Sequence, residues 1–294
     1  MTATSALNVL LLGGCRPRQS VYGLSQKQNR VNFEPYSQIN GTNNIGDMLQ
    51  TIAFLRGEIE IPQEFRFLCK IPPSMTPMAG TKDFSNLDAA VLELSTPIDF
   101  VFRGLSLNHF RFRRTVYAPI RELDAESGKL LGKWVRAVKE GDEKAREEAS
   151  VQLVDRIPDT LEQAELVRAL VRETRSRRVD IAAGLERICG ILGCPVGVVL
   201  YFFRYMPDGR AVDWPPGFAG EVIDAANRLG LPTFDPTPTL LEFGIERAFR
   251  EDQEFHYVPR LRPIMGEQMI RFAESICQRG AADRSADINV PIPA

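Results

Sequence analysis

Three unbroken apolar runs constrain the fold of this chain more than any other feature of its sequence. They read NVLLL at 8–12, DAAVLEL at 88–94 and PVGVVLYFFRY at 195–205. A strand with one face in water alternates apolar and polar residues, whereas a strand covered on both faces is apolar throughout. Segments with helical periodicity separate the runs, among them 46–55 and 217–229. This order predicts an α/β fold in which a mostly parallel sheet lies between layers of helices.

The remaining elements give weaker signals. The stretch from about 125 to 192 is highly charged and has apolar residues at helical spacing, which predicts a helical insertion at about 122–192. We expect one domain over 1–280 that includes this insertion, followed by a flexible tail at 281–294. The other expected elements are strands at 31–39, 65–71 and 231–234, a helix or turn at 242–250, and a terminal helix at 262–279.

Composition and missing motifs exclude several classes of protein. The formal net charge of -2 offers no basic field for nucleic acid, and no apolar run reaches the ~18 residues of a membrane helix. The five cysteines are odd in number and include no CxxC pair, which argues against disulfides and a metal site and favours a reducing cytoplasm. The short apolar N-terminal stretch indicates a buried strand better than a signal peptide. Neither GxGxxG nor GxxxxGK[ST] occurs, so we expect no nucleotide cofactor, and GxSxG is also missing.

A Gly-Gly-Cys-Arg turn follows the first buried run. Gly13 and Gly14 permit the tight backbone geometry of a strand that passes into a helix. A helix N-terminus presents free N–H groups and a positive dipole end, which lower the pKa of a thiol and hold an oxyanion. Cys15 is therefore a candidate nucleophile, a small residue beside an anion site, or a buried residue of a tight turn. Arg16 adds a positive charge that suits a carboxylate or phosphate.

The chain has only two histidines, His109 and His256, which narrows any mechanism that needs one. His256 lies in a segment that we expect to be a loop between two helical segments. A histidine acts as a general base when an acceptor orients its ring, and Asp252 is close enough in sequence to do so. Asp235, after the short strand at 231–234, is a second acidic candidate. His109 lies among aromatic and basic residues and is interpreted as a packing or substrate-edge residue.

Together these residues resemble the SGNH (GDSL-like) hydrolase superfamily. Gly13-Gly14-Cys15 takes the place of that family's Gly-Asp-Ser turn, with Cys where the nucleophilic Ser stands. Asp252 and His256 correspond to its last motif, although three residues separate them instead of two. The resemblance covers about 1–110 and 195–280. It implies a three-layer flavodoxin-like sandwich, and it is closest to members with a Gly-(Ser/Asn)-Cys turn, some of which are linked to cell-surface polysaccharide modification.

The other blocks of that family fit in part. The resemblance implies that a glycine N–H helps to form an oxyanion hole, and Gly41 is the match, with Asn43 as a polar neighbour. The family's Gly-x-Asn after the next strand is missing, because LELSTP stands there. Ser95, Thr96 or Asn108 is the possible replacement.

The resemblance implies acyl-ester hydrolysis or acyl transfer on a small-molecule or saccharide ester, with an acyl donor in the transfer reaction. His256 is the expected general base, Asp252 its orienting group and Cys15 the candidate nucleophile. The other expected site residues are Gly14, Arg16, Gly41, Asn43, Ser95 and Asn108. A non-catalytic binding or scaffold protein is the competing interpretation, favoured by the loss of the Ser and of the Gly-x-Asn.

Overall fold

The computed structural model describes residues 6–28, 30–33, 41–72, 75, 84–200, 204–205, 211–212, 216–250 and 253–287. The chain divides into two compact units. The first unit contains 1–43, 79–96 and 180–294, and the second contains 44–78 and 97–179. The expectation of a single domain over 1–280 with an insertion at about 122–192 stays a prediction.

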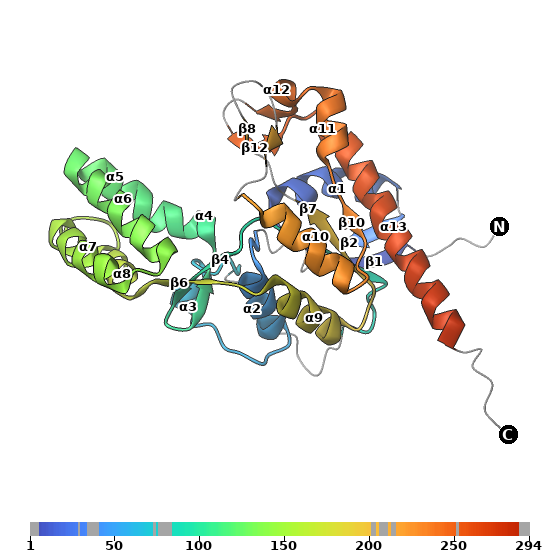
Figure 1. Cartoon of the computed structure of the whole chain (residues 1–294), viewed down its shortest axis with the longest axis horizontal. Helices are drawn as coiled ribbons and strands as arrows, with labels where there is room; N and C mark the ends of the chain where they lie inside the picture. The colour runs from blue at the N-terminus through green and yellow to red at the C-terminus, as the bar shows by residue number, and fades with distance from the viewer. Residues whose placement is uncertain are drawn as a thin grey trace. The chain divides into compact units, whose positions relative to one another are not determined.

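A five-stranded parallel sheet forms the centre of the first unit (Figure 1). Its strands are β1 (Leu7–Leu12), β2 (Val31–Phe33), β3 (Ala89–Leu94), β7 (Val196–Leu200) and β10 (Thr233–Phe234), in the order β10-β7-β3-β1-β2. Every neighbouring pair is parallel. Counted along the chain this is the order 2-1-3-4-5 of flavodoxin-like sheets, which reverses direction between β1 and β3. The expected α/β sandwich is therefore confirmed.

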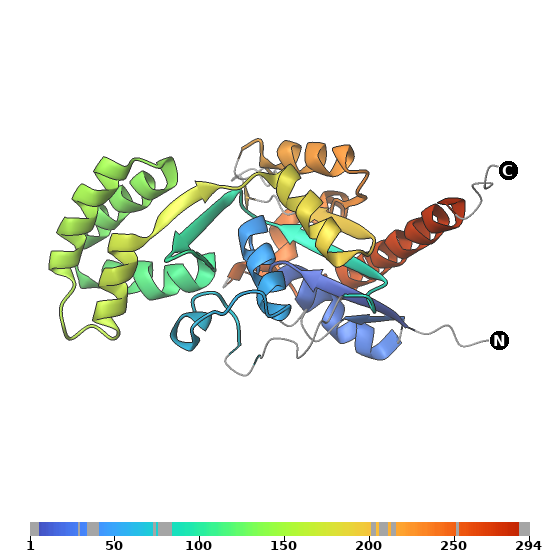
Figure 2. The same cartoon turned by 90° about the horizontal axis from the view of Figure 1, so that it is seen from below.

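Helices α1 (Cys15–Gln28) and α13 (Arg262–Asp287) pack against each other and cover one face of this sheet (Figure 2). The interface is apolar: Val9, Leu11 and Val91 from the strands meet Val21 of α1 and Ile270 of α13. The opposite face of the strands is buried too, as Leu10, Leu12 and Leu92 show. Burial on both faces explains why the strands are unbroken apolar runs.

The remaining elements of the first unit are short, apart from two helices that pack against each other, α9 (Ile181–Leu192) and α10 (Phe218–Arg228). Helices α11 (Thr237–Phe243) and α12 (Ile245–Ala248) lead into the antiparallel pair β11 (Phe249–Arg250) and β12 (Gln253–Tyr257). A second antiparallel pair is β8 (Arg204–Tyr205) and β9 (Ala211–Val212). Helix α13 continues beyond the expected end at Arg279 to Asp287, so this part of the expected tail is helical.

The second unit joins a small antiparallel sheet to a group of helices. The strands are β4 (Ile98–Phe102), β5 (Leu105–Leu107) and β6 (Arg175–Arg178), in the order β5-β4-β6. Trp134 lies fully buried at the core of the unit and donates a hydrogen bond from Nε1 to the carbonyl of Val171 at 3.1 Å. The helices are α2 (Ile45–Leu55), α3 (Gln63–Arg66), α4 (His109–Phe112), a π-helical turn (Arg113–Tyr117), α5 (Ala118–Leu123), α6 (Ala125–Glu140), α7 (Glu143–Arg156) and α8 (Ala164–Glu173).

Two predictions of secondary structure in the second unit are wrong. The expected strand at 65–71 is instead the end of α3 and a turn, because Phe65, Leu68 and Cys69 bury one side at helical spacing. The helical region at 125–192 is interrupted by β6, whose sequence RSRR is mostly exposed and carries no apolar signal. This strand pairs with β4 through backbone hydrogen bonds, which do not depend on side-chain hydropathy.

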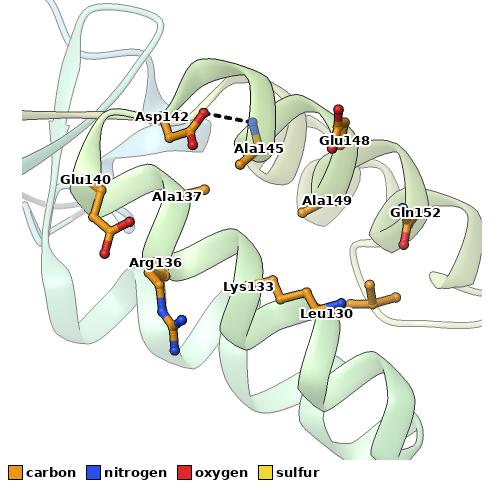
Figure 3. A pocket seen from close by; sticks show the side chains of 10 residues that line it. All are labelled: Leu130, Lys133, Arg136, Ala137, Glu140, Asp142, Ala145, Glu148, Ala149 and Gln152. Atoms are coloured by element: carbon orange, nitrogen blue, oxygen red, sulfur yellow. Dashed lines mark hydrogen bonds between the residues drawn. The ribbon is translucent and has the colours of Figure 1, made fainter.

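Charged side chains line a groove of about 290 Å³ between α6 and α7 (Figure 3). Asp142 begins α7 there by accepting a hydrogen bond from the N–H of Ala145 at 2.9 Å. Lys133, Arg136, Glu140 and Glu148 place both signs of charge along its walls. A lining that mixes both signs of charge is typical of a solvated helical surface.

Candidate functional site

The sequence after β1 forms the centre of the candidate site. Gly13 and Gly14 make a bend, and α1 begins at Cys15. The bend lies at the carboxyl end of β1, beside β3, where this sheet order reverses and where ligands bind in open α/β sheets. The side chain of Cys15 lies outside the described residues, so its role as a nucleophile stays a prediction.

A buried carboxyl group lies under this bend, and it was not predicted from the sequence as a site residue. Glu93 on β3 is 2% exposed, and its Oε2 accepts a hydrogen bond from the N–H of Gly14 at 2.6 Å. A Cβ on Gly13 would lie 2.6 Å from the Cβ of Glu93, and a Cβ on Gly14 would lie 2.7 Å from Oε2. These separations are shorter than van der Waals contact, so the two glycines are required by the close approach of Glu93.

Burial raises the pKa of Glu93 to about 7, because a carboxylate loses its hydration in the core. The positive charge of Arg16 and the hydrogen bond from Gly14 act in the opposite direction, and the desolvation is the larger effect. Glu93 therefore changes its protonation state in the neutral pH range. The signal in the sequence was a single acid inside the apolar run VLEL, at the position that parallel pairing sets beside Gly13.

Arg16 is held in the first turn of α1 by two aromatic rings. Its guanidinium carbon lies 4.8 Å from the ring centroid of Phe249 and 5.5 Å from that of Tyr257, and the residue is 3% exposed. A cation over the faces of desolvated aromatic rings is attracted by their quadrupoles. Since Phe249 and Tyr257 belong to β11 and β12, this contact ties the C-terminal hairpin to the start of α1.

His256 lies on β12, directly before Tyr257, and is half-buried. The expectation of a loop between two helical segments is wrong here, because the segment pairs with β11 as an antiparallel strand. Its register shifts between the pairs Phe249–Tyr257 and Arg250–Gln253, so His256 falls in an irregular stretch of the ladder. Such irregularities redirect side chains and recur next to active sites. The proposed partner Asp252 lies outside the described residues.

A third segment completes this edge of the sheet. The N–H of Gly41 donates to the carbonyl of Gly13 at 3.0 Å, and the side-chain amide of Asn43 donates to the carbonyl of Gly41 at 3.0 Å. The carbonyl of Asn43 accepts from the N–H of Ser95 at 2.8 Å and from its hydroxyl at 3.1 Å. The structure thus places Gly13, Gly41, Asn43 and Ser95, which come from three segments of the chain, in one hydrogen-bonded group, with Gly14 directly after Gly13.

This group limits which amides can face a substrate. The N–H of Gly14 is bound by Glu93 and that of Gly41 by Gly13, so neither points to an oxyanion in this structure. The first amides of α1, which begin at Cys15, are the donors that such a site offers. Asp235, the second acidic candidate, accepts hydrogen bonds from the N–H and the hydroxyl of Thr237 at the start of α11.

Asn108 belongs to the second unit. It is 1% exposed and caps α4, with its side-chain oxygen accepting from the N–H of Arg111 at 3.1 Å. Its own N–H donates to the carbonyl of Leu68 at 2.8 Å. His109, the next residue, is half-buried, and its loss of hydration lowers its pKa to about 4. Asn108 is buried and His109 packs edge-on against Phe100. For His109, the choice between a packing role and a substrate-edge role stays a prediction.

Metal clusters and membrane-spanning helices are two features for which the part of the chain that the structure describes gives an answer. Within it, no three His, Cys, Asp or Glu side chains gather in a way that would hold a metal ion. Among the same residues, no helix combines the length and the apolar character that crossing a membrane requires.

Comparison with known proteins gives one result that bears on the family. No curated protein matches the chain. The profile of the TviD N-terminal domain matches residues 7–272, which include the second unit, most of the first and every described residue of the candidate site. The match does not test the resemblance to SGNH hydrolases. Because it extends over most of the sequence, the chain belongs to the TviD N-terminal domain family.

Proposed function

We propose that this protein is an acyltransferase or acyl-ester hydrolase that acts on a saccharide or small-molecule ester at the carboxyl edge of its parallel sheet. The observation that carries the proposal is the meeting of two chain segments there. The turn that bears Cys15 follows β1, and Arg16 in the same turn of α1 packs on Tyr257, the neighbour of His256. The family is related to modification of the Vi antigen polysaccharide, which favours a saccharide hydroxyl as the acceptor.

The chemistry takes two steps. His256 removes the proton of the Cys15 thiol, and the thiolate attacks the ester carbonyl of the donor. The tetrahedral oxyanion collapses, the alcohol leaves with the proton from His256, and a thioester remains on Cys15. An acceptor hydroxyl then loses its proton to His256 and attacks the thioester, which restores the thiol. Amides at the start of α1 stabilise the oxyanion, each for roughly 3–4 kcal/mol where such donors have been removed in other enzymes.

A direct route uses the same site without the thioester. In this route His256 activates the acceptor hydroxyl, which attacks the donor ester itself, and Cys15 is a small residue of the turn. Arg16 places a positive charge in the first turn of α1, which would favour a donor with a carboxylate or phosphate. The two routes differ in whether an acyl group is ever bound to the protein.

The test measures acetyl-ester hydrolysis and acetyl transfer to a saccharide with the purified protein. The variants are Cys15→Ala and His256→Ala, with Cys189→Ala, on α9, as the matched control for removal of a thiol. We expect both site variants to lose about 100-fold or more in kcat/KM and the control to keep its activity. Mass spectrometry of the quenched reaction identifies an acetyl group on Cys15 if the thioester route operates.

The competing function is non-catalytic ligand or partner binding. It is favoured by one observation, namely that the N–H groups of Gly14 and Gly41 are both bound within the protein. If the wild type and both site variants are equally inert toward esters and saccharide acceptors, the acyl-transfer proposal is wrong and the binding function replaces it.

A further inference from the structure

Glu93 is the one charged residue in the five strands of the parallel sheet, all of which the structure describes. Alternation along β3 places it on the same face as Ala89 and Val91, which pack toward α1 and α13. A carboxyl group in such a position costs free energy unless it is partnered. Its strand neighbours on this face are apolar, so the carboxyl group adds nothing to the apolar packing of the sheet.

The partners of Glu93 belong to the turn that carries the candidate nucleophile. Its Oε2 binds the N–H of Gly14, the residue directly before Cys15. Both glycines of the turn pack closely against it, so a side chain at either position would force Glu93 or the turn to move. The acid and the turn are therefore built around each other, and the orientation of the peptide that enters α1 depends on this hydrogen bond.

Among the residues whose side chains the structure describes, the charged group that acts on Glu93 from outside β3 is Arg16, on α1. The strand neighbours are apolar or glycine: Val199 of β7 is its register partner, and Gly13 follows the end of β1 on the other side. Helix α13 faces this side of the sheet with residues such as Ile270 and Ala273. The hairpin contributes the aromatic rings that hold Arg16. A change of charge on Glu93 is therefore felt first by Arg16 and by the Gly14 amide.

We propose that Glu93 is a positioning residue which, as a carboxylate, fixes the Gly13-Gly14-Cys15 turn and Arg16 in the geometry that the acyl-transfer site requires. This inference rests on the proposed function. The carboxylate attracts the Gly14 N–H and the guanidinium of Arg16 together, whereas the neutral acid keeps only the weaker hydrogen bond. Because the pKa of Glu93 is raised to about 7, the ordered form of the turn increases as the pH rises through the neutral range.

The test uses Glu93→Gln, which keeps the size of the side chain and an acceptor for Gly14 but removes the charge. We expect kcat to fall about tenfold or more with little change in KM, since Glu93 is buried and does not touch the substrate. The rise of kcat between pH 6 and 8 that Glu93 causes should disappear. Glu93→Asp keeps the charge one methylene further away and should restore part of the pH dependence. If Glu93→Gln is folded and has the kcat and pH profile of the wild type, the role is refuted.

A second readout does not depend on turnover. The rate of Cys15 alkylation by iodoacetamide is followed by peptide mass spectrometry from pH 5 to 9, with Cys189 as the internal control. Removing a negative charge beside the first turn of α1 favours the thiolate. We therefore expect the midpoint for Cys15 to move to lower pH by about half a unit or more in Glu93→Gln, and that for Cys189 to stay.

The two readouts separate the failure of this inference from the failure of the proposed function. A wild type that is inert toward esters, combined with a shifted alkylation profile, refutes acyl transfer and leaves Glu93 as the residue that positions Cys15. An active wild type with unchanged kcat and unchanged alkylation in Glu93→Gln refutes the role of Glu93 and leaves acyl transfer in place.

Discussion

Each compact unit contains a buried carboxyl group against which a glycine is packed, and the two groups differ in their partners. In the second unit, Asp99 accepts hydrogen bonds from Ser106 Oγ at 2.9 Å and from Arg177 Nε at 2.9 Å. In the first unit, Glu93 accepts one backbone hydrogen bond from Gly14. Burial raises the pKa of both acids.

This difference separates a structural acid from one that belongs to a site. The partners of Asp99 come from β5 and β6 and hold these strands to β4, so its hydrogen bonds join elements of secondary structure. The partners of Glu93 lie within one turn at the end of β1 and the start of α1, where the sheet order reverses. An acid that supports only a turn at a ligand-binding edge stabilises the geometry of that turn more than the fold as a whole.

The largest effect that would test the comparison is expected for Asp99→Ala. The buried Ser106 hydroxyl loses a charged partner, a bond worth about 1.5–3 kcal/mol, and the missing carboxyl group leaves a cavity. Together these should lower the free energy of unfolding by about 4 kcal/mol. Arg177 is 60% exposed and returns to water, so its ion pair contributes little. Urea denaturation measures the loss. Turnover per folded molecule should be unchanged, and a variant that is fully folded but inactive would remove the distinction between the two acids.

The second effect is the pH dependence of stability that Glu93 contributes. Its pKa is about 7 in the folded protein and 4.5 as the reference value, so folding favours the protonated acid. The contribution is complete below about pH 4.5 and is lost as the pH rises through 7, for a total of up to roughly 3 kcal/mol. Glu93→Gln lacks this contribution. Its free energy of unfolding should therefore fall less between pH 5 and pH 8 than that of the wild type.

Denaturation curves at both pH values provide this measurement, with the exposed Glu122→Gln as the control. Parallel changes in all three proteins would show that Glu93 does not titrate in this range.

The smallest expected effect is that of replacing the glycine packed against each acid. This pair of variants compares the two acids most directly. Gly14→Ala brings a methyl group 2.7 Å from Glu93 Oε2, and Gly46→Ala brings one 2.8 Å from the Cγ of Asp99. Overpacking of this kind costs about 2 kcal/mol in either case. Both variants are assayed at a temperature where circular dichroism shows them folded. Gly14→Ala should lose ester turnover and Gly46→Ala should keep it, so equal losses would contradict the separation of structural and site acids.

Much of the first unit could be predicted from the sequence, because its strands are buried on both faces. Continuous apolar runs identify β1, β3 and β7 without knowledge of their neighbours, and the glycines after β1 mark the end of a strand. The second unit was predicted less well. Strand β6 has the sequence RSRR and is held by pairing with β4, and the pattern at 65–71 did not distinguish a strand from the end of a helix. A strand that forms because it pairs with a neighbouring strand shows no hydrophobic pattern in its own sequence.

The candidate site shows the same division. The sequence by itself determined that Gly13, Gly14 and Cys15 follow a buried strand and that His256 is one of only two histidines, since these facts depend on composition and local pattern. Only the tertiary structure decided that Glu93 lies beneath the glycines and that Arg16 packs against the hairpin of His256. Parallel pairing and helix packing bring these residues together from distant parts of the chain, and no local pattern encodes a contact between Gly14 and an acid 79 positions later.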